Sequence, residues 1–160
     1  MNSPTPDAPD APGAPGAPDA PGSTVSNTDR HLALRVVTMP RETNVYGTIF
    51  GGVILSYIDQ AGFVEARRHG AHRWVTASID RVDFESPVHT GDIVSLYTRA
   101  ERLGTKSVTV CVEVEAERYL TKSVAKVTTA TVTLVSVDET GKPIPFRDPP
   151  TMSELPLARQ

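Results

Sequence analysis

The sequence predicts an α+β fold in which a curved antiparallel β-sheet wraps around one long central α-helix. It contains one segment with helical periodicity, about five segments with strand patterns, and mostly short turns between them. A single helix cannot cover both faces of such a sheet, so a sheet that curls around the helix is the simplest way to bury the apolar residues of both. The length of 160 residues suits one domain of this kind.

Residues 1–28 form a leader that differs in composition from the rest of the chain. It consists largely of Pro, Ala, Gly and Asp, and it holds seven of the 14 prolines. Such a segment cannot bury enough apolar surface to offset the entropy of ordering, so we expect it to be disordered. Its three aspartates account for the whole net charge of −3, and the remainder of the chain is neutral.

These properties exclude several classes of protein. A neutral domain lacks the basic field that is typical of nucleic-acid-binding proteins. No apolar run is long enough for a transmembrane helix, and the N-terminus lacks the features of a secretory signal. The single cysteine, Cys111, excludes an intramolecular disulfide. We therefore expect a protein of the reducing cytoplasm without nucleic-acid or membrane partners.

The first elements of the domain are expected to be a strand and the central helix. A strand at 31–38 ends before Pro40, and a polar loop at 41–48 follows it. At 53–69 apolar residues recur every three or four positions, which predicts a helix with Gly70 as its C-terminal stop. Small residues at its centre indicate a backbone that is pressed against the sheet. The expected apolar face consists of Ile54, Ile58, Ala61, Gly62 and Ala66.

Four further strand segments follow the helix, at 74–84, 93–102, 107–119 and 124–137. In the third of these, apolar residues alternate strictly with mostly charged ones, which predicts a sheet with one covered and one open face. The last segment is apolar on both faces near its end, so contact with another protomer is plausible there. Residues 147–160 lack periodicity and are expected to form an irregular tail.

The start of the helix carries the residues that are best placed for chemistry. Gly51 and Gly52 leave backbone N–H groups free at the helix N-terminus, where they can stabilise a developing negative charge. Asp59 lies about two turns into the helix, and Ser56 is on nearly the same face. A carboxylate at this position either faces solvent on a polar stripe or is paired in a cleft, and the periodicity leaves both alternatives open.

A series of short motifs follows one another along the chain. They are Thr43-Asn44-x-x-Gly47, Ile49-Phe50-Gly51-Gly52, Asp59, Val75-Thr76, Asp83-Phe84-x-x-Pro87-Val88-x-x-Gly91-Asp92, Gly104-x-x-Ser107-Val108 and Val137-Asp138-x-x-Gly141-Lys142-Pro143. Their order resembles that of acyl-CoA thioester hydrolases with the HotDog fold, in particular the cytosolic acyl-CoA hydrolase branch. The resemblance runs from about residue 31 to residue 145, and it implies a HotDog domain at 29–146.

The resemblance implies that Asn44 and Asp59 act together in hydrolysis of an acyl-CoA thioester, with Asn44 of one protomer facing Asp59 of the other. Asp59 would act either as a general base on a water molecule or as a nucleophile. The N–H groups around Gly51 and Gly52 would stabilise the oxyanion. A homodimer then has two equivalent sites, and trimers of dimers are common in this branch.

The further expected site residues are assigned to the substrate. Lys106 and Ser107 would contact the phosphates of CoA, and Tyr57, Phe63 and Phe84 are candidates for closing the acyl tunnel. CoA is part of the substrate, so no cofactor is expected, and the four histidines lack the spacing of zinc ligands. The alternative is a HotDog module that binds acyl-CoA without turnover. The expected catalytic residues are Asn44, Asp59 and Gly52, and the expected substrate-binding residues are Gly47, Phe50, Gly51, Ser56, Thr76, Lys106 and Ser107.

Overall fold

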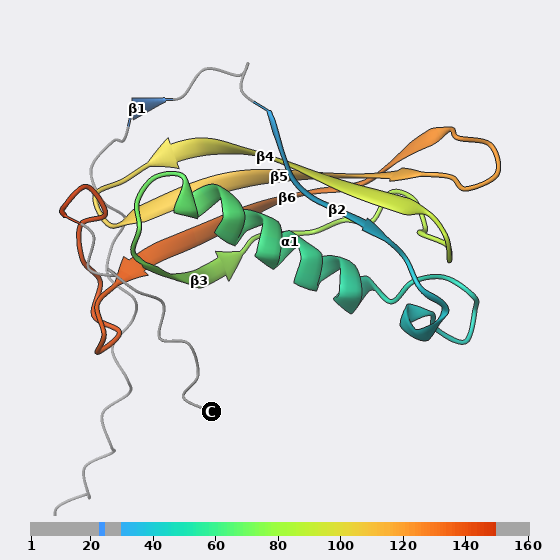
Figure 1. Ribbon diagram of the computed structural model, residues 1–160, viewed down its shortest axis with the longest axis horizontal. Helices are drawn as coiled ribbons and strands as arrows, with labels where there is room; N and C mark the ends of the chain where they lie inside the picture. Colours follow the sequence, from blue (N-terminus) through green and yellow to red (C-terminus); the bar gives the residue numbers. More distant parts are fainter. Residues whose placement is uncertain (1–22, 25–29, 150–160) are drawn as a thin grey trace, which may run out of the picture.

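The structure, a computed structural model, describes residues 23–24 and 30–149. Most of the expected leader and most of the expected tail therefore lie outside the described residues. No helix in the described part of the chain is long and apolar enough to cross a membrane. The elements are β1 (Ser23–Thr24), β2 (His31–Val37), the 3-10 helix η1 (Pro40–Glu42), α1 (Gly51–Arg67), β3 (Arg73–Ile79), β4 (Ile93–Leu103), β5 (Ser107–Glu117) and β6 (Val124–Val137) (Figure 1).

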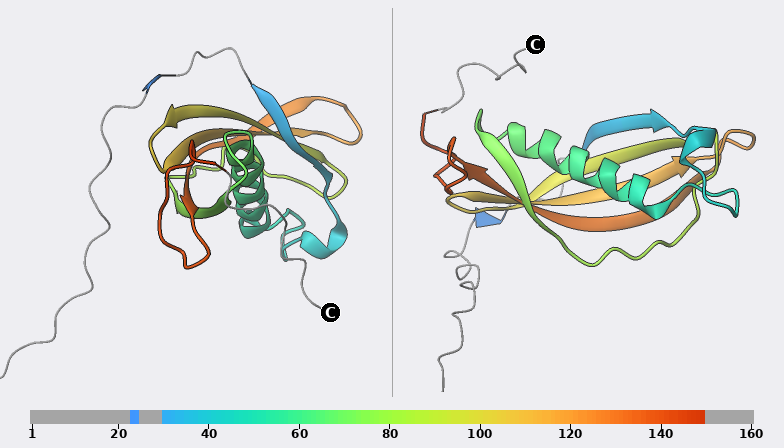
Figure 2. Two further views of the ribbon diagram at one scale, coloured as in Figure 1. Left: turned by 60° about the vertical axis from the view of Figure 1, so that its left-hand side comes forward. Right: turned by 90° about the horizontal axis from the view of Figure 1, so that it is seen from below.

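One antiparallel sheet curls around α1. The strands follow the order β1-β4-β5-β6-β3, and β2 pairs with the same edge of β4 as β1 does. The helix lies in the hollow of the sheet, so that the sheet covers it from one side (Figure 2). The predicted α+β class, with a curved antiparallel sheet around one central helix, is confirmed.

The helix boundaries differ from the prediction at both ends. The helix α1 begins at Gly51, two residues earlier than expected, and it ends at Arg67. Gly70 was expected to stop the helix, but it does not adopt the positive φ of a helix-terminating glycine. A Cβ at Gly70 would instead lie 2.8 Å from the carbonyl oxygen of Phe146. The position therefore requires glycine because the C-terminal segment passes so close to the connection between α1 and β3.

The strand that was expected at 74–84 ends at Ile79. Its pairing with β6 shifts in register between Thr76 and Ser78. Beyond the end of the strand, only single backbone hydrogen bonds connect residues 80–85 to β6. A register shift of this kind increases the local twist and turns an edge strand away from its partner. This explains why the pairing ends at Ile79, although the strand-like sequence continues to residue 84.

The short strand β1 lies within the segment that was expected to be disordered. Ser23 and Thr24 pair with Leu103 and Arg102 at the end of β4. The pairing of β2 with β4 covers residues 93–98 only. Together, β2 and β1 pair with residues 93–98 and 102–103 of this edge of β4.

The core lies between α1 and the inner face of the sheet. As the alternation predicted, the apolar residues of β5 face inward and are fully buried, whereas the glutamates of the opposite parity are only half-buried. The predicted apolar face of α1 is buried as well. A Cβ at Gly62 would lie 3.2 Å from Cγ1 of Val132 and 3.4 Å from Cδ1 of Leu134. The backbone of the helix therefore lies directly against β6, as its small residues indicated.

A carboxylate that the periodicity did not reveal, Glu65, is buried on the inner face of α1. Thr98 of β4 donates a hydrogen bond to its Oε2 at 2.9 Å, and the guanidinium of Arg68 lies 3.8 Å from the same oxygen. Burial by itself would raise the pKa of Glu65, but the nearby imidazole of His69, the hydrogen bond from Thr98 and the charge of Arg68 together outweigh it and hold the pKa below its ordinary value. The buried charge is thus compensated by local partners.

We expect the substitution Gly62→Val to lower the free energy of unfolding by about 2 kcal/mol, because extra methyl groups in a packed core force the helix and the sheet apart. Denaturant unfolding of the purified variant measures the change.

The matched control is Gly52→Val in the same helix, where a Cβ would meet nothing within 4 Å. We expect this control to lose well under half as much stability. Equal stability of the two variants would contradict the close packing at Gly62.

Candidate active site

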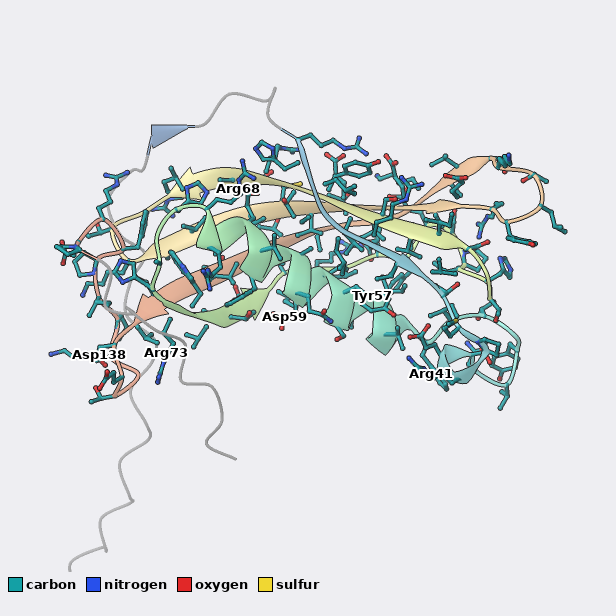
Figure 3. The ribbon with its side chains drawn as sticks, in the orientation of Figure 1. Arg41, Tyr57, Asp59, Arg68, Arg73 and Asp138 are labelled. Carbon is teal, nitrogen blue, oxygen red and sulfur yellow. The ribbon has the colours of Figure 1, made fainter. Side chains whose placement is uncertain are left out.

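Asp59 lies in the middle of α1, at the border between the buried and the exposed faces of the helix (Figure 3). Thr76 of β3 donates a hydrogen bond to its Oδ1 at 2.5 Å. Both side chains line a groove of about 510 Å³ between the helix and the strand. Of the two alternatives for Asp59, the structure supports a paired carboxylate in a cleft. Thr76, which was expected to contact the substrate, is placed here as a partner of the carboxylate.

The groove is polar at one end and apolar at the rest of its surface. Its polar groups come from Asp59, Gln60 and Thr76. Three of the apolar side chains are strongly exposed, so this surface is available to an apolar ligand or to a partner. Of the four, only Phe63 was expected to contact the acyl chain, since residues on the outer side of a helix and on an edge strand carry little periodic signal. The apolar lining consists of Phe63, Val64, Trp74 and Val75.

Asn44 lies in the loop between η1 and α1, and its side chain shapes that loop. Its Oδ1 accepts hydrogen bonds from the backbone N–H of Tyr46 at 2.9 Å and of Thr48 at 3.2 Å. Its Nδ2 donates to Oγ1 of Thr48 at 2.8 Å. Gly47 has a φ of 78°, a left-handed conformation that favours glycine. Within one chain, the amide of Asn44 therefore holds the loop in a defined shape.

The N-terminus of α1 opens to solvent and to a second cavity. Phe50 is the N-cap and makes no side-chain hydrogen bond to the helix, so the first N–H groups of the helix keep their capacity to bind an oxyanion. A Cβ at Gly51 would lie 3.3 Å from the ring of Phe84, and both residues line a cavity of about 310 Å³. Gly52 is exposed. The glycines thus leave the backbone accessible, as the sequence predicted.

A hydrogen bond between Tyr57 and Glu42 connects α1 to the Asn44 loop. The hydroxyl of Tyr57 donates to Oε1 of Glu42 at 2.9 Å, and the N–H of Met39 donates to Oε2 at 2.8 Å. The Met39 bond holds the pKa of Glu42 below its ordinary value, while burial and the nearby carboxylate raise the pKa of Tyr57. Tyr57 was a candidate for closing the acyl tunnel, and its hydroxyl also helps to hold the loop.

The expected site residues are separated within one chain. Gly51 and Asp59 are on the same helix, and their levels along its axis differ by about 12 Å. Lys106 and Ser107 lie at the turn between β4 and β5, at the opposite end of the helix from Gly51 (Figure 1). Ser56 is exposed and accepts a hydrogen bond from Gln60 at 3.3 Å. Within the described part of one chain, Asp59 is joined by Thr76, while the Asn44 loop, the glycines of the helix start and the Lys106–Ser107 turn are separate groups.

Cys111 is buried on the outer face of β5 and is unsuited to nucleophilic chemistry. Burial raises the pKa of its thiol to about 11, against the opposing charge of Arg99. The guanidinium of Arg99 is itself paired with Glu113 at 2.6 Å. A thiol with so high a pKa is almost entirely protonated at neutral pH. In the described ranges, no group of His, Cys, Asp and Glu side chains could hold a metal ion.

A single antiparallel sheet that curls around one helix, with a carboxylate of that helix in a groove, defines a hotdog-fold protein with a carboxylate site. Residues 46–121 match the thioesterase superfamily. The solved structure of a hexameric hotdog fold thioesterase of Campylobacter jejuni is similar to this one, with a TM-score of 0.68 and 46% sequence identity. The match covers 72% of this chain and 89% of that chain.

Two relatives extend this comparison to activity. The acyl-CoA thioester hydrolase YciA of Salmonella typhimurium is 35% identical over 128 residues, which are 78% of this chain and 96% of YciA. The uncharacterized acyl-CoA thioester hydrolase YkhA of Bacillus subtilis is 40% identical over 106 residues, which are 66% of this chain and 62% of YkhA. The chain belongs to the acyl-CoA thioester hydrolases of the thioesterase superfamily, and the predicted resemblance is confirmed.

We expect Cys111 in the folded protein to react very slowly with a thiol reagent at pH 8, because its pKa of about 11 leaves little thiolate and the side chain is buried. Mass spectrometry after timed exposure to iodoacetamide measures the modified fraction. Protein unfolded in guanidinium chloride is the control and should react at the rate of an ordinary thiol. Equal rates in the two states would contradict the burial of Cys111.

Proposed function

We propose that this protein hydrolyses the thioester of an acyl-CoA to a carboxylic acid and CoA, at sites that are shared between two protomers. The observation that carries the proposal is the carboxylate of Asp59, held by Thr76 at the polar end of an otherwise apolar groove. An acyl thioester matches this groove, since its reacting carbonyl is polar and its acyl chain is apolar. Membership of the acyl-CoA thioester hydrolases supports the same reaction.

In the proposed mechanism, Asp59 supplies the base or the nucleophile. With Oδ1 bound by Thr76, Oδ2 can take a proton from water, or it can attack the thioester carbonyl directly. N–H groups at Gly51 and Gly52 would stabilise the oxyanion of the tetrahedral intermediate. When the C–S bond breaks, the CoA sulfur leaves as a thiolate and takes up the proton that Asp59 removed from water. In the nucleophilic route an acyl anhydride of Asp59 forms first, and water then hydrolyses it to the carboxylic acid and supplies the proton for the thiolate. Asn44 would orient the water or the carbonyl, since an amide both donates and accepts.

The separation of these groups within one chain supports a shared site. The oxyanion donors and the carboxylate must both lie within about 3 Å of the reacting atoms, whereas about 12 Å of helix separates Gly51 from Asp59. A second copy would bring its own Asn44 and glycines to Asp59. The edge strand β3 supports this assembly, because among the described strands it pairs only with β6 and most of its residues are exposed.

Assembly beyond the dimer and the CoA contacts are parts of the same proposal. A trimer of dimers is supported by the hexameric relative from Campylobacter jejuni. We assign the CoA phosphates to Lys106 and Ser107, and contacts to the rest of the substrate to Gly47, Phe50 and Ser56. We propose no metal and no cofactor beyond the CoA of the substrate. The cytoplasm is the proposed compartment, which the single unpaired cysteine supports.

We expect Asp59→Asn to lower kcat by about 10²- to 10⁴-fold, which is the usual contribution of a positioned base. Release of free thiol from a panel of acyl-CoA substrates measures the change. The matched control is Asp80→Asn, at an exposed aspartate outside the groove, and it should keep wild-type turnover. Near wild-type turnover by a folded Asp59→Asn protein would contradict the assignment. Binding without thiol release by the wild type would favour a non-catalytic module.

A mixing experiment tests whether the site is shared. Asn44→Ala and Asp59→Asn are each expected to be inactive, but a mixed dimer has one site with both native residues if the two come from different protomers. The purified mixed dimer should then show about one half of the wild-type activity, because one of its two sites is intact. Coexpression of the two variants with different tags, followed by purification on both tags, allows the measurement. A mixed dimer without activity would show that each site draws both residues from one chain.

A further inference from the structure

We infer that Trp74 forms the end wall of the acyl-binding groove and limits this enzyme to short acyl chains. The inference rests on the proposed function and deepens it, because it names the substrate class. Three features of the groove support this role for Trp74: the direction in which its lining becomes apolar, its short length beyond Asp59, and the fixation of the tryptophan ring.

The groove becomes apolar in the direction of the connection between α1 and β3. Thr76 and Trp74 are two residues apart on one face of β3, because side chains alternate along a strand. Phe63 lies one helical turn beyond Asp59 in the same direction, since the chain passes from the end of α1 directly into β3. A thioester carbonyl held at Asp59 would therefore direct its acyl chain toward Trp74.

The distance available to the acyl chain is short. One helical turn from Asp59 to Phe63 covers about 6 Å, and two strand residues from Thr76 to Trp74 cover about 6.6 Å. A carbon–carbon bond is about 1.5 Å long, so an extended chain of about five bonds fills this length. Butyryl and hexanoyl groups fit the groove, whereas a palmitoyl group would meet the indole.

The tryptophan cannot move aside easily, because the C-terminal segment holds it. Its Nε1 donates to the carbonyl oxygen of Gly70 at 3.0 Å, and its ring centroid lies 5.5 Å from that of Phe146. His72 donates from Nε2 to the carbonyl oxygen of Phe146 at 3.0 Å. The side chains of His72, Trp74 and Phe146 are all buried. The wall is thus a packed cluster, and displacing it would break several contacts at once.

The first test replaces the indole of Trp74 with a smaller side chain. We expect Trp74→Leu to raise kcat/KM for octanoyl-CoA and lauroyl-CoA about tenfold relative to that for butyryl-CoA, which is the scale on which pockets discriminate small changes in an apolar chain. Thiol release is measured for a series from acetyl-CoA to palmitoyl-CoA. A loss of stability alone lowers all rates together, so the ratio between chain lengths reports on the wall.

A second variant serves in case Trp74→Leu does not fold. Val64→Phe fills the groove from the exposed side of α1. We expect it to lower kcat/KM for hexanoyl-CoA at least about tenfold relative to that for acetyl-CoA. The matched control is Val124→Phe, at an exposed valine at the start of β6 outside the groove, and its chain-length profile should equal that of the wild type.

The outcomes separate the inference from the proposed function. Absence of thiol release by the wild type across the series would overturn the proposed function and the inference with it. If the wild type is active but folded Trp74→Leu has the same kcat/KM ratios between chain lengths, the inference alone is overturned. If Trp74→Leu does not fold, unchanged ratios in Val64→Phe have the same meaning. Loss of the oligomer in Val64→Phe without a change in the ratios would assign the groove to the partner subunit and also overturn it.

Discussion

The close packing of α1 against β6 at Gly62 is the contact on which the rest of the structure depends. The domain has one helix, and the depth at which it lies in the sheet sets the position of everything that the helix carries. With the helix at this depth, Thr76 donates a hydrogen bond to the carboxylate of Asp59 at 2.5 Å. The width of the groove between α1 and β3 follows from the same contact, and so does the burial of Glu65 beside Thr98.

The elements that could be predicted from the sequence are those whose patterns are local. The segment 124–137 coincides with β6, and the ends of β4 and β5 lie within two residues of their predictions, because regular alternation and turn residues mark them. The burial of Glu65 and the fixation of Trp74 by Phe146 could not be predicted. Both depend on residues distant in sequence, and no local pattern shows which distant partner a side chain will meet.

The candidate site could be predicted from the sequence only in part. Motif order led to Asn44 and Asp59, but Asn44 does not line the groove of Asp59, and its loop is held by its own hydrogen bonds. Glu42 and Tyr57 add a connection from the helix to that loop. The loop is therefore ordered before any partner or substrate arrives, and such preorganisation reduces the entropy that a shared site would lose on assembly.

The position of Trp74 also has an experimental consequence. The chain contains one tryptophan, and this residue lies in the wall of the groove, against Phe146 and within hydrogen-bonding distance of Gly70. Emission from the indole therefore comes from a single, known environment beside the carboxylate. Changes in its intensity or wavelength report on the occupancy of the groove without a label, so that substrate entry can be followed in real time in the unmodified protein.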